Sequence, residues 1–318
     1  MRVRDLTFVI PVRIDTEDRL RNLSTVLRYT GRFFPASEVV VVENDAEPRT
    51  EEVCVEDDHV RRLFLPTEGR FSKSVTANAG ILAAGRPFVA IYDADVLLDR
   101  HAIDRALQLL RMRVIRAVLP FNGIFADVRG ELARRLSEQL EVGALGRITS
   151  VARAPYLPDL DVRVVKGGMV VADREVLRLE GGLNRRMVSY GWEDVELVRR
   201  LNRLGYRVFS LRRFSCVHLD HARGPDSVGN EHYVSNEAEF RKVATMPRPA
   251  LRRYVGTELD IAGLGAARER DTLRRRQARV NLATLQGIVH PVHELSVGIR
   301  VYGIRRAGSL IRERALRK

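Results

Sequence analysis

Two acidic segments of the sequence carry side chains that could do chemistry. The first, IYDADVLL at residues 91–98, places Asp93 and Asp95 two positions apart, directly after an apolar run. Both carboxylates can reach one hard cation if the backbone turns there, since Mg²⁺ and Mn²⁺ prefer oxygen ligands and keep coordination sites for phosphate oxygens. A metal held in this way neutralises a diphosphate leaving group. A solvated turn after a strand explains the same residues equally well, because Asp is common in turns.

The second segment, YGWEDVEL at residues 190–197, lies just before an expected helix. Glu193 and Asp194 would meet the positive end of the helix dipole there, which is the structural explanation of this pair. Trp192 favours a functional explanation, because it is the only tryptophan and stands beside both carboxylates. An indole face suits a sugar ring, and an ionised Asp194 can take a proton from an acceptor hydroxyl as that oxygen attacks an anomeric carbon.

The elements that must position these residues follow from the hydrophobic pattern. Apolar runs predict buried strands, and the amphipathic stretch from Thr16 to Gly31 predicts a helix. The predicted strands of the first half cover residues 6–12, 38–43, 60–65 and 87–92, and a second helix covers 73–84. Strands that alternate with helices and read as continuous apolar runs indicate an α/β fold, Rossmann-like, with a mostly parallel sheet flanked by helices.

Polar side chains follow three of these predicted strands. They are Arg13 and Asp15, Asn44 and Asp45, and Asp93 and Asp95. In open parallel sheets the ligand lies beyond the carboxyl ends of the strands. The three strand ends therefore direct polar groups to the place where a ligand is expected.

The second half of the chain has a different pattern. Residues 114–120, 164–172 and 206–211 are predicted strands, 195–204 is a predicted helix that ends at Gly205, and 143–163 is loop-like. From residue 226 the pattern is helical and charged. We expect one α/β domain over residues 1–225, followed by a basic helical C-terminal extension (226–318).

Residues 5–224 resemble a glycosyltransferase of the large family-2 type, and the GWED segment resembles the acceptor motif of galactosyltransferase-like and chondroitin-polymerase-like enzymes. The matching pieces run in the family's order: FVIPVRIDTEDRL, VVVVENDAEP, FSKSVTANAGILAAGRPFVAIYDADVLL, GGMVVADREVL, YGWEDVELVRRLNRLGYRV and CVHLDHARG. Each piece alone is weak, but the ordered set covers about two-thirds of the chain. The resemblance implies the GT-A fold. It also implies that residues 1–225 are the catalytic domain, with a nucleotide-binding half (1–110) and an acceptor and metal half (111–225).

The resemblance also implies roles for single residues. On the donor side, the nucleoside pocket would be lined by Pro11, Arg13, Asp15, Asn44 and Asp45, with Lys73 and Asn78 near the base and phosphates. Asp93 would face the ribose and the metal, Asp95 would be the more direct metal ligand, and Gly167 and Gly168 would form a close turn beneath the sugar. On the acceptor side, Trp192 and Glu193 would contact donor sugar or acceptor, Asp194 would be the general base, and His218 would complete the metal site.

Two histidines compete for that last place. His218 and His221 are three positions apart after a short expected strand. A lone histidine is more often structural than a ligand, but a site with two carboxylates needs further ligands, and this favours His218 over His221. Mn²⁺ accepts an imidazole more readily than Mg²⁺ does. The expected cofactor is therefore Mn²⁺, or Mg²⁺ in its place.

The implied reaction moves a hexose-type sugar from a nucleotide diphosphate sugar to a hydroxyl of a glycan or lipid-linked glycan. The resemblance favours UDP as the nucleotide. A base placed against the acceptor implies direct displacement with inversion at the anomeric carbon. The residues do not distinguish one donor sugar, acceptor, linkage or oligomeric state from another.

Composition and charge bound the other possibilities. The chain has 318 residues and a net charge of +13, of which +8 falls within residues 226–318. No apolar run is long enough to span a membrane, no secretory signal is visible, and Cys54 and Cys216 fit no metal spacing. We expect a cytoplasmic protein, whose basic amphipathic stretch at residues 297–318 is a candidate for peripheral contact with the inner face of a membrane.

Two rival functions fit parts of the sequence. A metal-dependent nucleotidyltransferase would need a glycine-rich phosphate loop after the first strand, and PVRIDTEDRL has no glycine. A nucleic-acid-binding protein would suit the high isoelectric point, but the basic C-terminal region has few aromatic residues among its basic ones. Neither nucleotidyl transfer nor nucleic acid as a partner is favoured.

Overall fold

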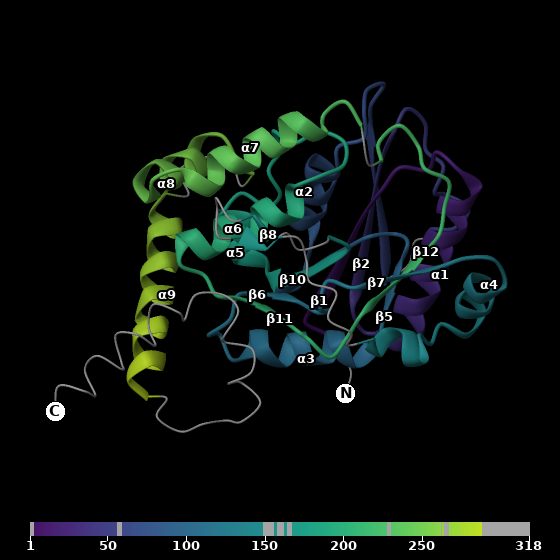
Figure 1. The fold of residues 1–318 in the computed structure, drawn as a ribbon, viewed down its shortest axis with the longest axis horizontal. Helices are drawn as coiled ribbons and strands as arrows, with labels where there is room; N and C mark the ends of the chain where they lie inside the picture. Colours follow the sequence, from purple (N-terminus) through teal and green to yellow (C-terminus); the bar gives the residue numbers. More distant parts are fainter. Residues whose placement is uncertain are drawn as a thin grey trace.

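The structure is a computed structural model, and it describes residues 3–55, 59–148, 156–157, 162–163, 167–227, 230–261, 263 and 267–287. Its centre is a seven-stranded sheet in the order β11-β6-β10-β4-β1-β2-β3 (Figure 1). In that order the strands are β11 (Val208–Ser210), β6 (Ala117–Leu119), β10 (Met169–Asp173), β4 (Phe88–Tyr92), β1 (Leu6–Val12), β2 (Glu38–Asp45) and β3 (Val60–Pro66). Only β10 runs antiparallel to its neighbours in this sheet. The predicted mostly parallel α/β sheet is confirmed.

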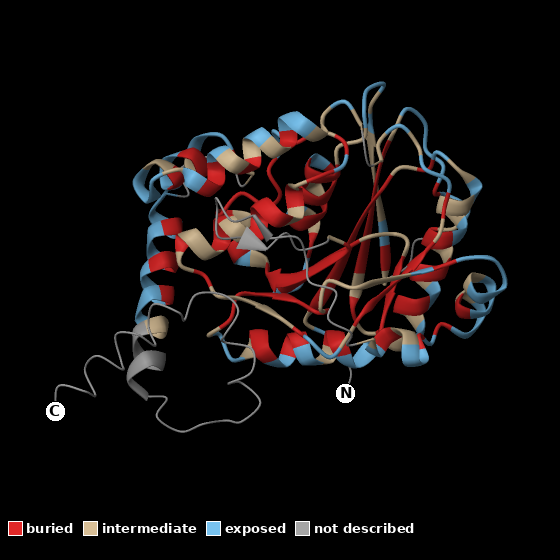
Figure 2. Ribbon diagram, viewed as in Figure 1, coloured by how far each residue is buried: buried red, intermediate tan, exposed pale blue. Residues whose placement is uncertain are grey.

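Helices cover both faces of this sheet, because its strands are apolar on both sides. Side chains of one strand alternate between the faces, so Phe8 and Ile10 of β1 lie in one core cluster and Val9 lies in the other. The first cluster is covered by α1 (Glu17–Phe33) and α3 (Arg100–Arg111). The second is covered by α2 (Lys73–Ala83), α5 (Arg174–Leu179) and α6 (Glu193–Leu204). Figure 2 shows the buried sheet between these layers.

Local signals set the ends of the helices that carry the site. The Thr16 side chain caps α1 by accepting a hydrogen bond from the backbone N–H of Arg19, as its place in the sequence predicts. Helix α6 ends at Gly205, whose φ of 102° is in the left-handed region that glycine adopts without a Cβ clash. The first predicted helix continues past Gly31 to Phe33, because a glycine within a helix is tolerated when the face around it packs.

A second, three-stranded sheet has no counterpart in the sequence prediction. Its order is β5-β12-β7, with β5 (Val96–Leu98), β12 (Cys216–Leu219) and β7 (Phe125–Val128). Strand β12 pairs antiparallel with β5 and parallel with β7. The remaining short elements are α4 (Gly130–Gln139), the 3-10 helix η1 (Gly143–Arg147) and the paired strands β8 (Tyr156–Leu157) and β9 (Val162–Arg163).

Within the described residues, three helices follow residue 226, as the helical pattern there predicts. They are α7 (Tyr233–Thr245), α8 (Arg248–Thr257) and α9 (Ala267–Gly287). Leu251, Val255 and Leu273 belong to the same core cluster as α2, α5 and α6, so these helices share the core of the catalytic half. The boundary at 225 stays a prediction, and the basic stretch 297–318 lies outside the described residues. No helix in the described ranges is both long and apolar enough to cross a bilayer.

A buried ion pair joins α9 to the core. Arg274 donates two hydrogen bonds to the fully buried carboxylate of Glu180, which also accepts one from the Tyr206 hydroxyl at 2.6 Å. We expect Arg274→Ala to lower the free energy of unfolding by about 3–5 kcal/mol, because it leaves a buried carboxylate without its cation. Urea unfolding measures the change. The matched control is the exposed Arg276→Ala on the same helix, which should stay within about 0.5 kcal/mol of the parent; equal effects of the two substitutions would contradict the prediction.

Candidate active site

The segment 93–95 forms the turn between the two sheets. It leaves β4 after Tyr92 and enters β5 at Val96, and its position is held by two backbone hydrogen bonds. Asp93 N–H donates to the carbonyl of Gly168 at 3.0 Å, and Leu219 N–H donates to the carbonyl of Asp95 at 2.8 Å. The pairing of β5 with β12 thus places Asp95 beside His218, which lies on β12, and near His221, which follows that strand.

Asp95, His218 and His221 form a group with metal-ligand geometry. Their ligand atoms all lie within 4.8 Å of one another. Asp95 Oδ2 is 3.1 Å from His221 Nε2 and 3.8 Å from His218 Nε2. The other ring nitrogen of His218, Nδ1, lies 3.0 Å from Asp127 Oδ1 on β7. The sequence favours His218 over His221, whereas the structure brings both imidazoles to the same carboxylate.

The chemistry of this group fits a divalent cation. His221 Nδ1 lies 2.8 Å from the carbonyl oxygen of Ala222, so both ring nitrogens of His221 face oxygen atoms. The ring must either carry two protons or share a cation with Asp95. Burial alone would raise the pKa of Asp95, but the hydrogen bond from His221 and the charges of both histidines lower it, so the carboxylate is ionised. One carboxylate and two imidazoles are a donor set that suits Mn²⁺ better than Mg²⁺.

Lys73 lies at the centre of a second cluster, next to the first. Its Nζ is 2.9 Å from Asp93 Oδ1, 3.0 Å from Asp194 Oδ2 and 3.5 Å from Glu193 Oε1. Burial alone would lower the pKa of Lys73, but the three carboxylates raise it well above its usual value, so the ammonium group stays charged. Asp93 is therefore paired with Lys73, and its expected place among the metal ligands stays a prediction.

The start of α6 presents Glu193 and Asp194 to this lysine. Glu193 Oε2 accepts a hydrogen bond from the backbone N–H of Gly191 at 2.9 Å. Burial, together with the neighbouring Asp194 charge, raises the pKa of Glu193 to about 7. Gly167 passes against Asp194 so closely that a Cβ there would overlap the Asp194 carboxylate. Gly168, with a φ of 113°, leaves equally little room between the backbone and the Phe125 ring.

Trp192 is held by aromatic rings of α7. Its ring stacks on Phe240 with centroids 5.1 Å apart and an interplanar angle of 20°, and the Tyr233 ring lies 5.9 Å away. One indole face is thus covered by protein, which leaves less of Trp192 for a sugar than the sequence suggests. Both Trp192 and Ser189 have positive φ, 74° and 61°, which is uncommon for residues other than glycine and often marks a functional segment.

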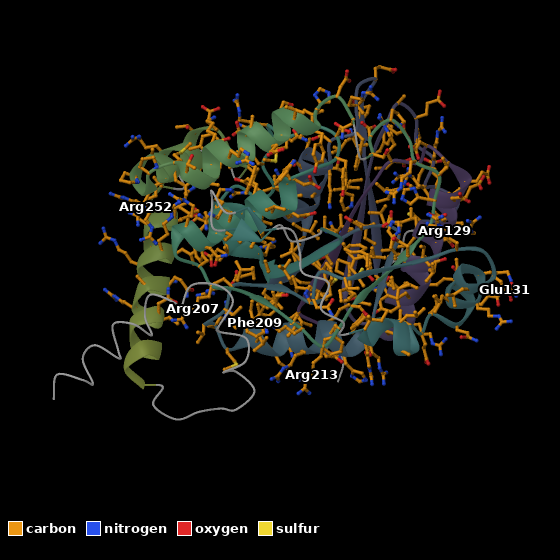
Figure 3. All side chains as sticks on the ribbon, viewed as in Figure 1. Arg129, Glu131, Arg207, Phe209, Arg213 and Arg252 are labelled. Atoms are coloured by element: carbon orange, nitrogen blue, oxygen red, sulfur yellow. The ribbon has the colours of Figure 1, made fainter. Side chains whose placement is uncertain are left out.

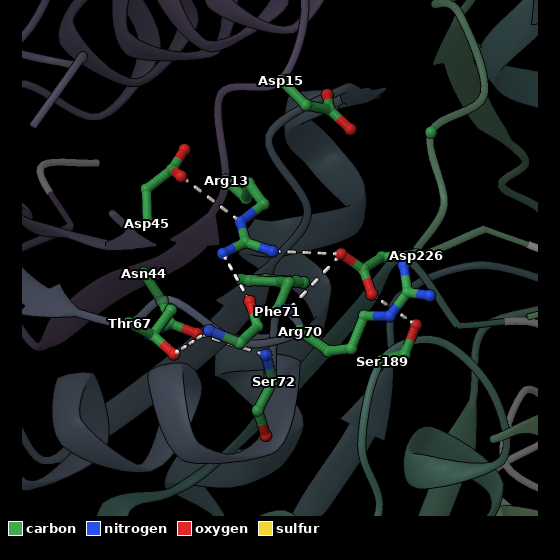
Figure 4. Close-up of polar contacts among 12 residues, drawn as sticks. Arg13, Asp15, Asn44, Asp45, Thr67, Arg70, Phe71, Ser72, Ser189 and Asp226 are labelled. Carbon is green, nitrogen blue, oxygen red and sulfur yellow. Dashed lines mark hydrogen bonds and ion pairs between the residues drawn. The ribbon is translucent and has the colours of Figure 1, made fainter. Parts of the chain in front are cut away.

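The ends of β1 and β2 form a third cluster around Arg13 (Figure 4). Arg13 lies 3.2 Å from Asp226 Oδ2 and 3.6 Å from Asp45 Oδ1, and it donates to the carbonyl of Gly69 at 2.9 Å. Asp226 also accepts a hydrogen bond from the Ser189 hydroxyl at 2.8 Å. Asp226 thus connects Arg13, at the end of β1, to Ser189, in the loop that precedes α6. The two predicted halves of the domain therefore meet at this cluster.

The other residues predicted for the donor side differ in their surroundings. Asn44 accepts from the backbone N–H of Ser72 and donates to the carbonyl of Leu65, which places it beside the Arg13 cluster. Asp15 is exposed and pairs with Arg19 at 2.9 Å.

Two more predicted donor residues have roles within the fold. Pro11 lies inside β1, opposite Val42 of β2. Asn78 uses both ends of its amide on the backbone of Leu183, so its predicted contact with the donor stays a prediction.

Four residues that contact these clusters or Trp192 could not be predicted from the sequence. They are Asp127, Asp226, Tyr233 and Phe240, which reach the site through pairing and packing between distant segments. His221 was detectable, because its spacing from His218 is visible in the sequence.

Two solved structures resemble this fold at low sequence identity. A mannosyltransferase from Pyrobaculum calidifontis, in complex with GDP-Man and Mn²⁺, is 18% identical with a TM-score of 0.50, over 93% of this chain and 79% of that one. Glucosyl-3-phosphoglycerate synthase from Mycobacterium tuberculosis, in complex with phosphoglyceric acid, is 17% identical with a TM-score of 0.51, over 77% of this chain and 81% of that one. Comparison with curated protein sequences gives no match.

A family model agrees with the fold. The model described as "Glycosyltransferase like family 2" matches residues 4–238, a span that includes all three clusters. Since this match covers most of the chain, the protein belongs to the glycosyltransferase-like family 2 and is a glycosyltransferase with the GT-A fold.

Proposed function

We propose that the protein is an inverting, Mn²⁺- or Mg²⁺-dependent transferase that moves a hexose-type sugar from a nucleotide diphosphate sugar to a hydroxyl of a glycan or lipid-linked glycan. The observation that carries this proposal is the position of Lys73. Its ammonium group touches Asp93, next to the metal group, and Asp194, the proposed base, at 2.9 and 3.0 Å. A single lysine therefore contacts both the expected metal side, through Asp93, and the expected acceptor side, through Asp194.

Each cluster has a separate task in this proposal. Asp95, His218 and His221 would hold the metal, which when bound supplies positive charge for the leaving diphosphate. Asp194 Oδ2 accepts the proton of the acceptor hydroxyl as its oxygen attacks the anomeric carbon. Lys73 orients that carboxylate, and Glu193 shapes the start of α6 through its bond to Gly191.

The donor side of the proposal rests on the Arg13 cluster. Arg13, Asn44 and Asp45 lie together at the carboxyl ends of β1 and β2, where a nucleoside is expected in this type of sheet. UDP is the proposed nucleotide because the sequence resembles glycosyltransferases of the family-2 type. The similar mannosyltransferase holds GDP-Man, so guanosine is the alternative that an experiment has to compare.

A binding screen tests this function. We expect UDP-sugars to raise the melting temperature of the protein when Mn²⁺ is present and to have little effect in EDTA, because a metal held by Asp95, His218 and His221 would supply positive charge for the diphosphate. The hits should then show slow release of UDP. GDP-sugars serve as the comparison. Equal stabilisation with and without metal, or none by any nucleotide sugar, would contradict the proposal.

A further inference from the structure

The outer sides of α8 and α9 carry a set of exposed arginines that the glycosyltransferase function does not use. These six residues, called here the arginine face, are Arg252, Arg253, Arg268, Arg275, Arg276 and Arg279. Figure 2 shows the inner sides of both helices buried against the core and their outer sides exposed. Figure 3 shows Arg252 at the outer edge of the molecule.

Helical geometry gathers three of the four exposed arginines of α9 into one stripe. Residues 268, 275 and 279 repeat at intervals of seven and four, which returns to the same side of a helix. The opposite side of α9 packs on the core through Leu273, Arg274 and Gln277. The stripe therefore points directly away from the protein.

These arginines are not neutralised by the protein itself. Within the part of the chain that the structure describes, none of the six forms an ion pair with a carboxylate. Helix α8 has three arginines and no acidic residue, and α9 has six arginines against two acidic residues. The surface field over both helices is therefore strongly positive.

Arginines on another helix of this protein, α4, do have carboxylate partners. On α4, Arg134 pairs with Glu131 and Glu138, and Arg135 pairs with Glu131, all at 2.8 Å or less. The high arginine content of the chain is thus balanced locally on α4 and left unbalanced on α8 and α9. Residues 288–318, which directly follow α9 in the sequence, add seven basic residues against two acidic ones.

We propose that the arginine face docks the enzyme on the surface of an anionic phospholipid membrane. A straight stripe of guanidinium groups suits a flat array of phosphates, which arginine binds with two parallel N–H donors. Single-stranded nucleic acid would call for aromatic side chains between the basic ones. The aromatic residue of α8, Tyr254, is buried, and α9 has none. The membrane is therefore the favoured partner, and it is a different surface from the predicted stretch 297–318.

Vesicle binding by the full chain tests this assignment. The variant Arg252→Gln/Arg275→Gln/Arg279→Gln is compared with the control Arg21→Gln/Arg134→Gln/Arg135→Gln, which loses the same charge from other exposed helices. The probes are vesicles of phosphatidylglycerol with phosphatidylcholine, and vesicles of phosphatidylcholine alone. We expect the parent to bind only the anionic vesicles, and the first variant to bind them roughly a hundredfold more weakly, at roughly fivefold for each arginine. The control should keep most of the parent's binding.

Three outcomes would overturn the proposal. The first is that Arg252→Gln/Arg275→Gln/Arg279→Gln binds anionic vesicles as tightly as the parent, which would mean that another segment binds the membrane. The second is an equal loss in both variants, which would mean that only net charge matters. The third is no vesicle binding together with salt-sensitive binding of double-stranded DNA, which would make nucleic acid the partner. Thermal unfolding of both variants checks that the exposed substitutions leave the fold intact.

Discussion

Asp194→Asn is expected to lower the rate of sugar transfer by about 10²–10⁴-fold while leaving the affinity for the donor within about threefold, because a positioned general base contributes about that factor. Asparagine has nearly the same shape and can still accept the hydrogen bond from Lys73, which is 3.0 Å from Asp194 Oδ2 in the parent. What it loses is the ability to take the proton of the acceptor hydroxyl. The loss should therefore fall on turnover.

Two measurements on the same protein separate these effects. Calorimetry with UDP and Mn²⁺ reports donor binding, and release of UDP in the presence of acceptor reports transfer. Asp271→Asn, an exposed isosteric change on α9, is the matched control and should behave as the parent. Normal turnover by Asp194→Asn would remove Asp194 from the mechanism. Loss of donor binding together with turnover would make it part of the donor site.

Asp95→Ala is expected to weaken Mn²⁺-dependent nucleotide binding by more than about 100-fold. Its carboxylate is the oxygen donor of the metal group, and its Oδ2 lies within 3.8 Å of both histidine Nε2 atoms. Loss of even an outer partner of a metal ligand costs about 10- to 100-fold in affinity, so loss of a direct ligand should cost more.

A small series of variants tells the ligands apart. Calorimetry of UDP with Mn²⁺ is compared for His221→Ala, His218→Ala and Asp93→Asn. If the group of three holds the metal, both histidine variants should lose binding, and Asp93→Asn should lose less because Asp93 is paired with Lys73. Metal-dependent binding that survives in both histidine variants and disappears in Asp93→Asn would contradict this assignment.

The first half of the fold could be predicted because its signals are local. Strands β1, β2 and β4 are short apolar runs, and α1 begins at a threonine that caps it, so neighbouring residues in the sequence suffice. The glycine at the end of α6 works in the same way. Arg13, Asn44 and Asp194 lie in these elements or directly after them, and Lys73 begins α2. The local signals place these residues, and the resemblance supplies the role of Lys73.

The three-stranded sheet could not be predicted because its strands are short and its pairing is distant. Strand β5 has three residues and pairs with β12, about 120 positions later. That pairing alone brings His218 and His221 to Asp95, so the sequence could propose a histidine ligand only through a resemblance. Asp226 and Phe240 likewise reach Arg13 and Trp192 through packing of the C-terminal helices and the loop before them. Packing of this kind leaves no periodic signal in the sequence.

The stereochemistry of the product tests the central claim most directly. Proton NMR of the glycoside formed from a UDP-α-sugar and a suitable acceptor reads the anomeric configuration directly, because the glycosidic bond prevents mutarotation at that carbon. A single displacement with Asp194 as the base predicts a β-linked product. An α-linked product would require a different mechanism and would contradict the role assigned to Asp194.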